Sequence, residues 1–142
     1  MAVVAAIDES ERAQHVVREA ADLAAAFDDE LQLVHVFERS ELVNVLEVTV
    51  DEEDLTENYE VQQATERILD AAANGVEVEY EPIARIGEPA TKVVDYADEV
   101  DARYIVIGGR KRSPTGKALF GSVTQKVILN ADRPVVNTAG AT

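Results

Sequence analysis

Short apolar runs alternate with longer segments of helical periodicity along the whole chain. The runs are rich in Val, Ile and Leu and are bounded by acidic or turn-forming residues, so they predict buried β-strands. A further strand is expected where valines and a tyrosine alternate with glutamates, a pattern typical of a half-exposed strand at a sheet edge. In chain order, the expected strands are Ala2–Ile7, Leu31–Phe37, Val76–Tyr80, Tyr104–Ile107 and Pro134–Asn137.

The segments between these strands have the periodicity and the end signals of helices. Ser10 is the expected N-cap of a first helix, whose apolar stripe runs from Ala13 to Phe27 and which ends at Asp28-Asp29. Three further helices are recognised by their end signals, which are an Asn-Gly pair that stops a helix, a proline in a first turn and a capping serine. These helices are expected from about Leu55 to Asn74, from Pro89 to Glu99 after the Gly87-Glu88 turn, and from Val123 to Asn130 with Ser122 as the cap.

One segment has no single interpretation. Residues 38–54 are too apolar for a plain loop, yet acidic residues and serine interrupt the apolar positions. A short helix, a flap over a ligand and a surface for a partner all fit this pattern.

Strands and helices that alternate in this way predict an α/β fold with a parallel sheet and helices on both faces. We expect five strands in the order 3-2-1-4-5. In such sheets a ligand binds beyond the carboxyl ends of the strands, where the direction of winding reverses. That point lies between the first and fourth strands, so Asp8 and Gly108 are expected to face the same crevice.

Composition limits the classes of function. Acidic residues outnumber basic ones by 28 to 13, and the formal net charge is −15. Acid-rich surfaces stay hydrated where salt screens charge, so the composition resembles that of proteins from salt-loving cytoplasms. The same charge repels phosphate backbones, and we therefore expect no general binding of nucleic acids.

Length and the remaining residue types exclude further possibilities. The 142 residues suit a single domain, residues 1–142. We expect no membrane association and no signal peptide, because the apolar runs are short and the first one lacks a basic region before it. The chain has no cysteine, which excludes disulfides and thiolate metal sites. His15 and His35 lie far apart in the sequence, in a predicted helix and a predicted strand, so we expect no metal site from them and ordinary packing instead.

The loop between the fourth strand and the last helix combines glycines with a concentration of positive charge. No acidic residue occurs from Ala102 to Ala131, whereas six of the thirteen basic residues lie there. A glycine-rich loop that leads into a helix exposes backbone N–H groups and the positive end of the helix dipole. We therefore expect a phosphate site, the alternative being an ordinary solvated loop. A Walker A loop is excluded, because Lys111 and Ala118 stand where that motif needs Gly and Ser or Thr.

Six short segments, spread over nearly the whole chain, resemble the universal stress protein family. ATP-binding members of this family carry the motif G-x2-G-x9-G-[ST] at the fourth strand. Here Gly108 and Gly121-Ser122 match its two ends at the right spacing, and Lys111 replaces its middle glycine. The segments that carry the resemblance are Val3–Asp8 with Ser10, Leu33–Val36, Gly87–Pro89, Ile105–Gly108, Gly121–Thr124 and Arg133–Val136.

The resemblance implies a site for ATP, with Asp8 and Val36 at the adenine and ribose and the glycine loop at the phosphates. Lys111 either costs on the order of 1 kcal/mol, if the family's backbone needs a positive φ there, or reaches a phosphate with its ammonium group. The residues expected to bind the nucleotide are Asp8, Val36, Ile107, Gly108, Arg110, Lys111, Gly121, Ser122, Val123 and Thr124.

The implied function is a cytoplasmic ATP-binding module of the stress response that acts as a homodimer, with or without Mg²⁺ at the nucleotide. In the family the last strand pairs with its symmetry mate, which implies an interface at Pro134, Val135, Val136 and Asn137. Two alternatives stay open: the same fold without ATP, its cationic loop binding another anion or a protein partner, and a slow ATPase. The ATPase is less favoured, because the sequence places no histidine, cysteine or glutamate at the phosphates to act as a base.

Overall fold

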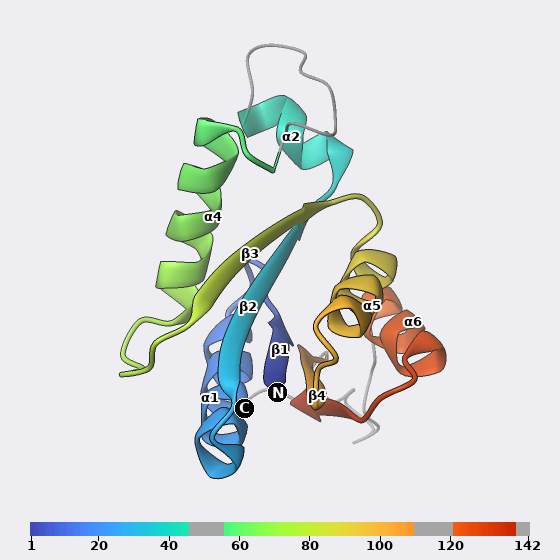
Figure 1. Cartoon of the computed structure of the whole chain (residues 1–142). Helices are drawn as coiled ribbons and strands as arrows, with labels where there is room; N and C mark the ends of the chain where they lie inside the picture. The colour runs from blue at the N-terminus through green and yellow to red at the C-terminus, as the bar shows by residue number, and fades with distance from the viewer. Residues whose placement is uncertain (46–55, 110–120, 139–142) are drawn as a thin grey trace, which may run out of the picture.

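A five-stranded sheet forms the centre of the computed structural model, which describes residues 1–45, 56–109 and 121–138 (Figure 1). All strand pairs are parallel, and their order is β3-β2-β1-β4-β5. The expected order is therefore confirmed, and β1 lies between β2 and β4. The strands are β1 (Ala2–Ala6), β2 (Glu30–Phe37), β3 (Glu81–Ile86), β4 (Tyr104–Gly108) and β5 (Val135–Thr138).

Helices cover both faces of the sheet, and each face has its own apolar core. Alternate strand residues point to opposite faces: Val3 and Leu33 belong to the core under α1 (Ala13–Phe27) and α4 (Tyr59–Ala72). Val4 and Val34 belong to the core under α5 (Pro89–Glu99), and Val127 of α6 (Ser122–Asn130) packs into the same core. Both faces being buried explains why the strands appear in the sequence as continuous apolar runs.

The segment 38–54 begins as a helix. The helix α2 covers Arg39–Val45 and follows the carboxyl end of β2 (Figure 1). Leu42 of α2 is 6% exposed and belongs to the core under α1 and α4. The rest of this segment, residues 46–54, lies outside the described residues, so the choice between a flap and a partner surface stays open there.

Two expected helix caps are wrong by a short distance. The hydroxyl and backbone N–H of Ser10 bond to Oδ1 of Asp8, so Ser10 stabilises the turn, and α1 begins only at Ala13. Ser122 is the first residue of α6, and Gly121 occupies the N-cap position. In both places a serine lies near the helix start, but neither helix is capped by a side-chain hydrogen bond, so serine in the sequence marks the turn and not the cap itself.

The third strand was predicted too early in the chain. Residues 76–80 form no strand, and β3 begins at Glu81, which pairs with Gln32. Val76 and Tyr80 nevertheless pack against the core, so the apolar alternation reflects burial without strand pairing. The true strand contains Pro82, which cannot donate a ladder hydrogen bond and is tolerated because β3 is an edge strand.

The expected start of the helix at about Leu55 is also wrong, because α4 begins at Tyr59. The Asn58 side chain caps it by accepting hydrogen bonds from the N–H groups of Glu60 and Val61.

The end of α1 and the start of α5 agree with their sequence signals. Asp28 ends α1 in the left-handed conformation, with φ of 53°. Pro89 opens α5, and the Glu88 side chain accepts a hydrogen bond from the backbone N–H of Thr91. Among the helices that the structure describes, no segment is long and apolar enough to cross a membrane.

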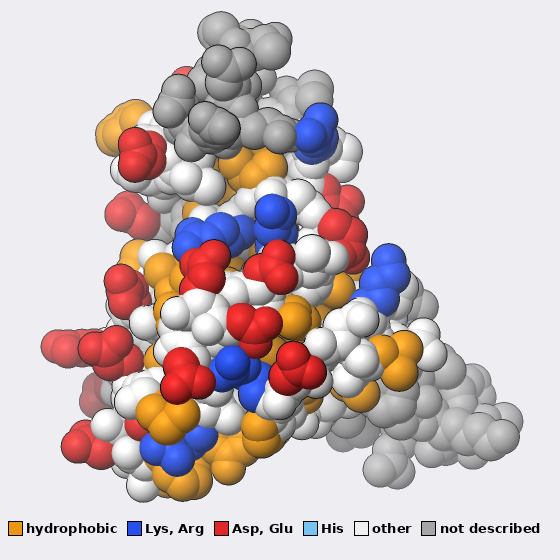
Figure 2. Space-filling model, turned by 45° about the vertical axis from the view of Figure 1, so that its right-hand side comes forward, with side chains coloured by type: hydrophobic (Ala, Val, Ile, Leu, Met, Phe, Trp, Pro, Cys, Tyr) orange, Lys and Arg blue, Asp and Glu red, His pale blue; other side chains and the backbone are white. Residues whose placement is uncertain are grey.

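Acidic side chains are spread over the surface. Figure 2 shows them over much of the height of one face of the described chain, interspersed with basic side chains. Some are paired, as Arg133 is with Asp98 and Asp101 at 3.1 and 3.3 Å. With 28 acidic and 13 basic residues in the chain, however, most carboxylates cannot have a basic partner of their own.

Candidate functional site

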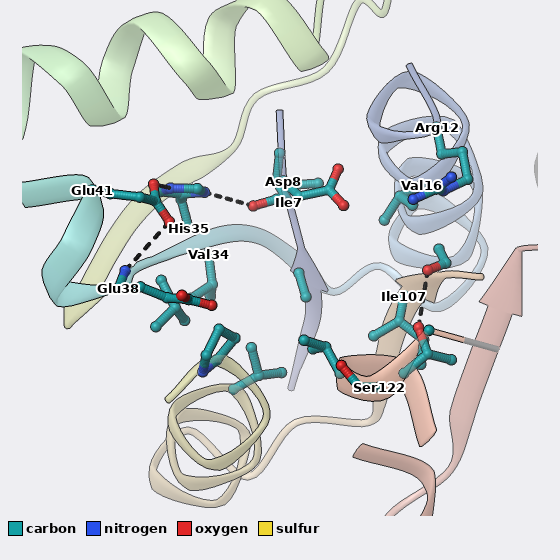
Figure 3. A pocket seen from close by; sticks show the side chains of 18 residues that line it. Ile7, Asp8, Arg12, Val16, Val34, His35, Glu38, Glu41, Ile107 and Ser122 are labelled. Carbon is teal, nitrogen blue, oxygen red and sulfur yellow. Dashed lines mark hydrogen bonds and ion pairs between the residues drawn. The ribbon is translucent and has the colours of Figure 1, made fainter. Parts of the chain in front are cut away.

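A cavity of about 290 Å³ lies at the carboxyl ends of β1, β2 and β4, where the strand order reverses (Figure 3). Segments far apart in the sequence form its walls. Of the ten residues expected at the nucleotide, Arg110 and Lys111 lie outside the described residues. The other eight all line the cavity: Asp8, Val36, Ile107, Gly108, Gly121, Ser122, Val123 and Thr124.

The Asp8 carboxylate is fixed by the turn that follows β1. Its Oδ1 atom accepts hydrogen bonds from the backbone N–H of Ser10 at 2.9 Å and from the Ser10 hydroxyl at 2.5 Å. Both contacts use the same oxygen, and Asp8 is exposed. Among the described residues none bonds to Oδ2, so this atom can accept a hydrogen bond from a hydroxyl or amino group of a ligand.

Close packing explains the glycine at the end of β4. A Cβ atom on Gly108 would lie 3.0 Å from Cγ2 of Val16 and 3.7 Å from Cβ of Arg12. The first of these distances is tighter than ordinary van der Waals contact. The missing side chain thus lets the end of β4 approach α1 at the edge of the cavity.

A side-chain hydrogen bond joins the end of β4 to the first turn of α6. The Thr124 hydroxyl donates to the backbone carbonyl of Gly108 at 3.0 Å, and Thr124 is only 5% exposed. The hydroxyl hydrogen is thereby used within the protein. Thr124 can still offer its backbone N–H to a ligand, because that group lies in the first turn of the helix.

The first turn of α6 lines the cavity and carries backbone N–H groups that the helix itself leaves unpaired. Gly121 is the N-cap, and the first helical hydrogen bond in this turn runs from the N–H of Gln125 to the Gly121 carbonyl, at 3.0 Å. The N–H groups of the residues before Gln125 have no partner within the helix. Together with the positive end of the helix dipole, they make this part of the wall favourable for an anion.

Arg12 is a cavity residue that sequence reasoning missed. It lies at the N-cap of α1, across the cavity from α5 (Figure 3). Its Nε atom is buried and has no hydrogen-bond partner among the described residues. The signal available in the sequence was an arginine shortly after Asp8, at the switch point of the sheet. With Ser10 as the expected N-cap, Arg12 falls inside the predicted helix, whereas in the structure it is itself the N-cap of α1.

The opposite wall is acidic and apolar. Glu38 and Glu41 line the cavity on the side of β2 and α2, and Figure 3 shows them across the cavity from Arg12. Apolar side chains of β2 and α5 lie between the two charged sides: Val34, Val36, Pro89 and Val93. The cavity therefore has a cationic end and an anionic end with an apolar floor.

The turn before α5 is held by Glu88. Hydrogen bonds from the hydroxyl and the backbone N–H of Thr91, together with the Lys126 ammonium 3.6 Å away, keep the pKa of Glu88 below its ordinary value. Glu88 stays ionised and links the start of α5 to α6. This link fixes the position of Pro89 at the cavity wall.

Comparison with known proteins agrees with this architecture. The sequence model of the universal stress protein family matches residues 1–137. Universal stress protein MJ0531 of Methanocaldococcus jannaschii is 29% identical over 137 residues, which are 94% of this chain and 79% of that protein.

Solved structures from Archaeoglobus fulgidus are similar over almost the full length. A universal stress protein from this organism is 38% identical, with a TM-score of 0.66 over 96% of this chain and 97% of that one. A universal stress protein from the same organism, in complex with dAMP, is 32% identical, with a TM-score of 0.62 over 96% of each chain. The chain with the switch-point cavity described above belongs to the universal stress protein family.

Proposed function

We propose that this protein binds an adenine nucleotide, ATP being the expected ligand, in the cavity at the switch point of the sheet. One observation carries the proposal: eight of the ten residues expected to bind ATP line that cavity. The dAMP complex of the Archaeoglobus fulgidus relative, which is 32% identical, supports an adenine nucleotide as the ligand class.

The charges of the cavity suggest the orientation of the ligand. The adenine and ribose would lie on the apolar floor near Val36, within reach of the free Oδ2 of Asp8. The phosphates would lie at the start of α6, where the helix itself leaves the N–H groups of Ser122 and Val123 unpaired and Arg12 adds a positive charge. The reverse orientation would place phosphates against Glu38 and Glu41, which like-charge repulsion disfavours.

Arg110 and Lys111 complete the proposed site from outside the described residues. Both follow Gly108 closely in the sequence, and both are cationic. We assign Lys111, which replaces the middle glycine of the family motif, to a phosphate contact. The ammonium group would then supply charge where other members rely on close approach of the backbone.

Nucleotide binding is tested first by mass spectrometry of the denatured protein and then by calorimetry at fixed high salt. Gly121→Val should abolish ATP binding, because a branched side chain would occupy the space of the phosphates. Lys111→Ala should weaken binding by about 1–2 kcal/mol, the usual scale of one charge-assisted contact. The affinity of Lys111→Gly should fall between those of the wild type and Lys111→Ala, because glycine restores the loop geometry of the family but loses the phosphate contact. Arg18→Ala, at an exposed position on α1, is the matched control. If the wild type binds ATP and neither Gly121→Val nor Lys111→Ala changes the affinity, the proposed position of the site is contradicted.

The replaced motif glycine also supports a second candidate function. In this alternative the cationic loop binds another anion or a protein partner, and the wild type does not bind ATP. Calorimetry would then detect no binding at millimolar ATP, and Lys111→Gly would create some. The same set of variants therefore separates the two candidates.

We further propose that the protein acts in the cytoplasm as a homodimer through β5. Among the described strands β5 is the edge next to β4, so one side of its backbone has no strand partner. α6, which packs beside β5, carries Ile128 and Leu129 with 43% and 76% of their surface exposed. An unpaired strand beside exposed apolar side chains is a surface that a second copy could cover.

A further inference from the structure

The imidazole of His35 is held in a single orientation. His35 lies in β2 and is 4% exposed, and its Nδ1 atom is 2.8 Å from the backbone carbonyl of Ile7 (Figure 3). A carbonyl oxygen can only accept a hydrogen bond, so Nδ1 carries a hydrogen and donates it. In the neutral ring Nε2 then carries a lone pair and no hydrogen.

This Nε2 atom faces a second group that can only accept. The Oε2 atom of Glu41 lies 3.3 Å from Nε2. The other carboxylate oxygen of Glu41, Oε1, accepts a hydrogen bond from the backbone N–H of Glu38 at 3.3 Å (Figure 3). This bond holds the Glu41 carboxylate with Oε2 toward His35. Two lone pairs that face each other require a cation or a proton between them.

A third donor completes a ligand set. One carboxylate oxygen of Glu9, on the exposed turn after β1, lies within 4.8 Å of the ligand atoms of both His35 and Glu41. In a tetrahedral zinc site with bonds of about 2.0–2.2 Å, neighbouring ligand atoms are about 3.3–3.6 Å apart. The separation of 3.3 Å between His35 and Glu41 already has this value. Glu9 needs only a small movement of an exposed side chain.

We propose that Glu9, His35 and Glu41 bind a divalent transition-metal ion of the zinc class. The bond from His35 Nδ1–H to a backbone carbonyl is the support that metal-binding histidines usually have. The nitrogen ligand disfavours Mg²⁺ and Ca²⁺, which prefer sites made of oxygen alone. Three protein ligands leave a fourth position for water or for a ligand group.

The proposed metal site is separate from the proposed phosphate site. His35 and Glu41 belong to the acidic wall of the cavity, whereas Arg12 and the start of α6 form the cationic end. The ion would join the turn after β1, strand β2 and helix α2, and so would fix α2 against the sheet. It does not depend on a bound nucleotide, so the metal assay and the ATP assay can fail independently.

The test uses the full chain and Zn²⁺ alone, without nucleotide, in molar KCl with excess Mg²⁺. These conditions suppress unspecific attraction of cations to a protein of net charge −15. Competition with a chelating dye should give one tightly bound Zn²⁺ per chain. Glu41→Gln and His35→Asn should each weaken binding about 100-fold or more, and Glu9→Gln about tenfold or more. Glu11→Gln and His15→Asn, which change the same residue types outside the cluster, should bind like the wild type.

His35→Asn keeps a side-chain N–H near the position of Nδ1, and so retains a donor for the Ile7 carbonyl. If this variant does not fold, NMR of the wild-type imidazole decides, because Zn²⁺ should shift the Nε2 resonance of His35 far more than that of Nδ1. The proposal is overturned if the wild type binds Zn²⁺ no more tightly than Glu41→Gln. That result would mean that a proton alone bridges His35 and Glu41.

Discussion

Replacing Thr124 with valine tests how the cavity is held in shape. Valine has nearly the same size and shape as threonine but lacks the hydroxyl that donates to the Gly108 carbonyl at 3.0 Å. The residue is 5% exposed, so water has little access to take the place of the hydroxyl. The substitution therefore removes the bond between the end of β4 and the first turn of α6 and leaves the packing almost unchanged.

The expected cost follows from this geometry. A hydrogen bond within a protein contributes about 0.5–1.5 kcal/mol, and a buried acceptor left without a donor costs about 1–3 kcal/mol. We expect Thr124→Val to lower the free energy of unfolding by about 1–2 kcal/mol. For a chain of 142 residues this corresponds to a fall in melting temperature of about 3–7 °C. The affinity for ATP should fall about tenfold, or about 1.4 kcal/mol, because the N–H groups of α6 lose their fixed position.

Thr124→Ser is the matched control. It keeps the hydroxyl and loses one buried methyl group, which costs about 0.8 kcal/mol of stability. Urea unfolding should therefore show a loss for both variants, whereas calorimetry should show weaker ATP binding only for Thr124→Val. The reasoning is refuted if Thr124→Val keeps wild-type stability and affinity, or if Thr124→Ser loses as much affinity as Thr124→Val.

Three further predictions concern charge and assembly. The melting temperature should rise steadily from low to molar KCl, because the Debye length falls from about 10 Å at 0.1 M to about 3 Å at 1 M; a constant value would mean that the acidic residues are already compensated. Val136→Glu should convert a dimer to a monomer in analytical ultracentrifugation, since the proposed two-fold contact would receive two charges at once; unchanged sedimentation would place the interface elsewhere. Arg103 bonds to Asp29 at 2.6 Å and keeps the pKa of that carboxyl below its ordinary value of 3.8. The resulting stabilisation is present above pH 4 and is lost as the pH falls through the lowered pKa of Asp29. The difference in urea stability between the wild type and Asp29→Asn should therefore become smaller as the pH falls below 4. A difference that is independent of pH would contradict the ion pair.

Most of the sheet could be predicted from the sequence because its strands are buried on both faces. Four of the five strands appear as continuous apolar runs, and their predicted ends differ from the observed ones by only a residue or so. The exception is β3, an edge strand that contains Pro82 and whose residues are half-buried or exposed. Its pattern is weaker than that of the neighbouring residues 76–80, which are packed but unpaired.

The candidate site was predictable to the extent that it depends on backbone position. Asp8 follows β1 and Gly108 ends β4, and these strands are parallel neighbours, so the fold alone brings the two residues together. The contributions of Arg12 and of the pair His35–Glu41 depend on how far side chains reach, and on the start of α1 and the presence of α2. Sequence periodicity contains no information on such contacts between side chains of different elements.

The uneven distribution of charge in the chain bears on both proposals. An overall charge of −15 repels nucleotides, so a phosphate site needs a local excess of positive charge. The segment from Ala102 to Ala131 contains no acidic residue, and among the described residues Arg12 and the start of α6 both line the cavity. The acidic wall favours a ligand of the opposite charge, because Glu38 and Glu41 repel an anion and attract a cation. Under the two proposals, the phosphates of a nucleotide would lie at one end of the cavity and the metal ion at the other, so the two ligands would not compete.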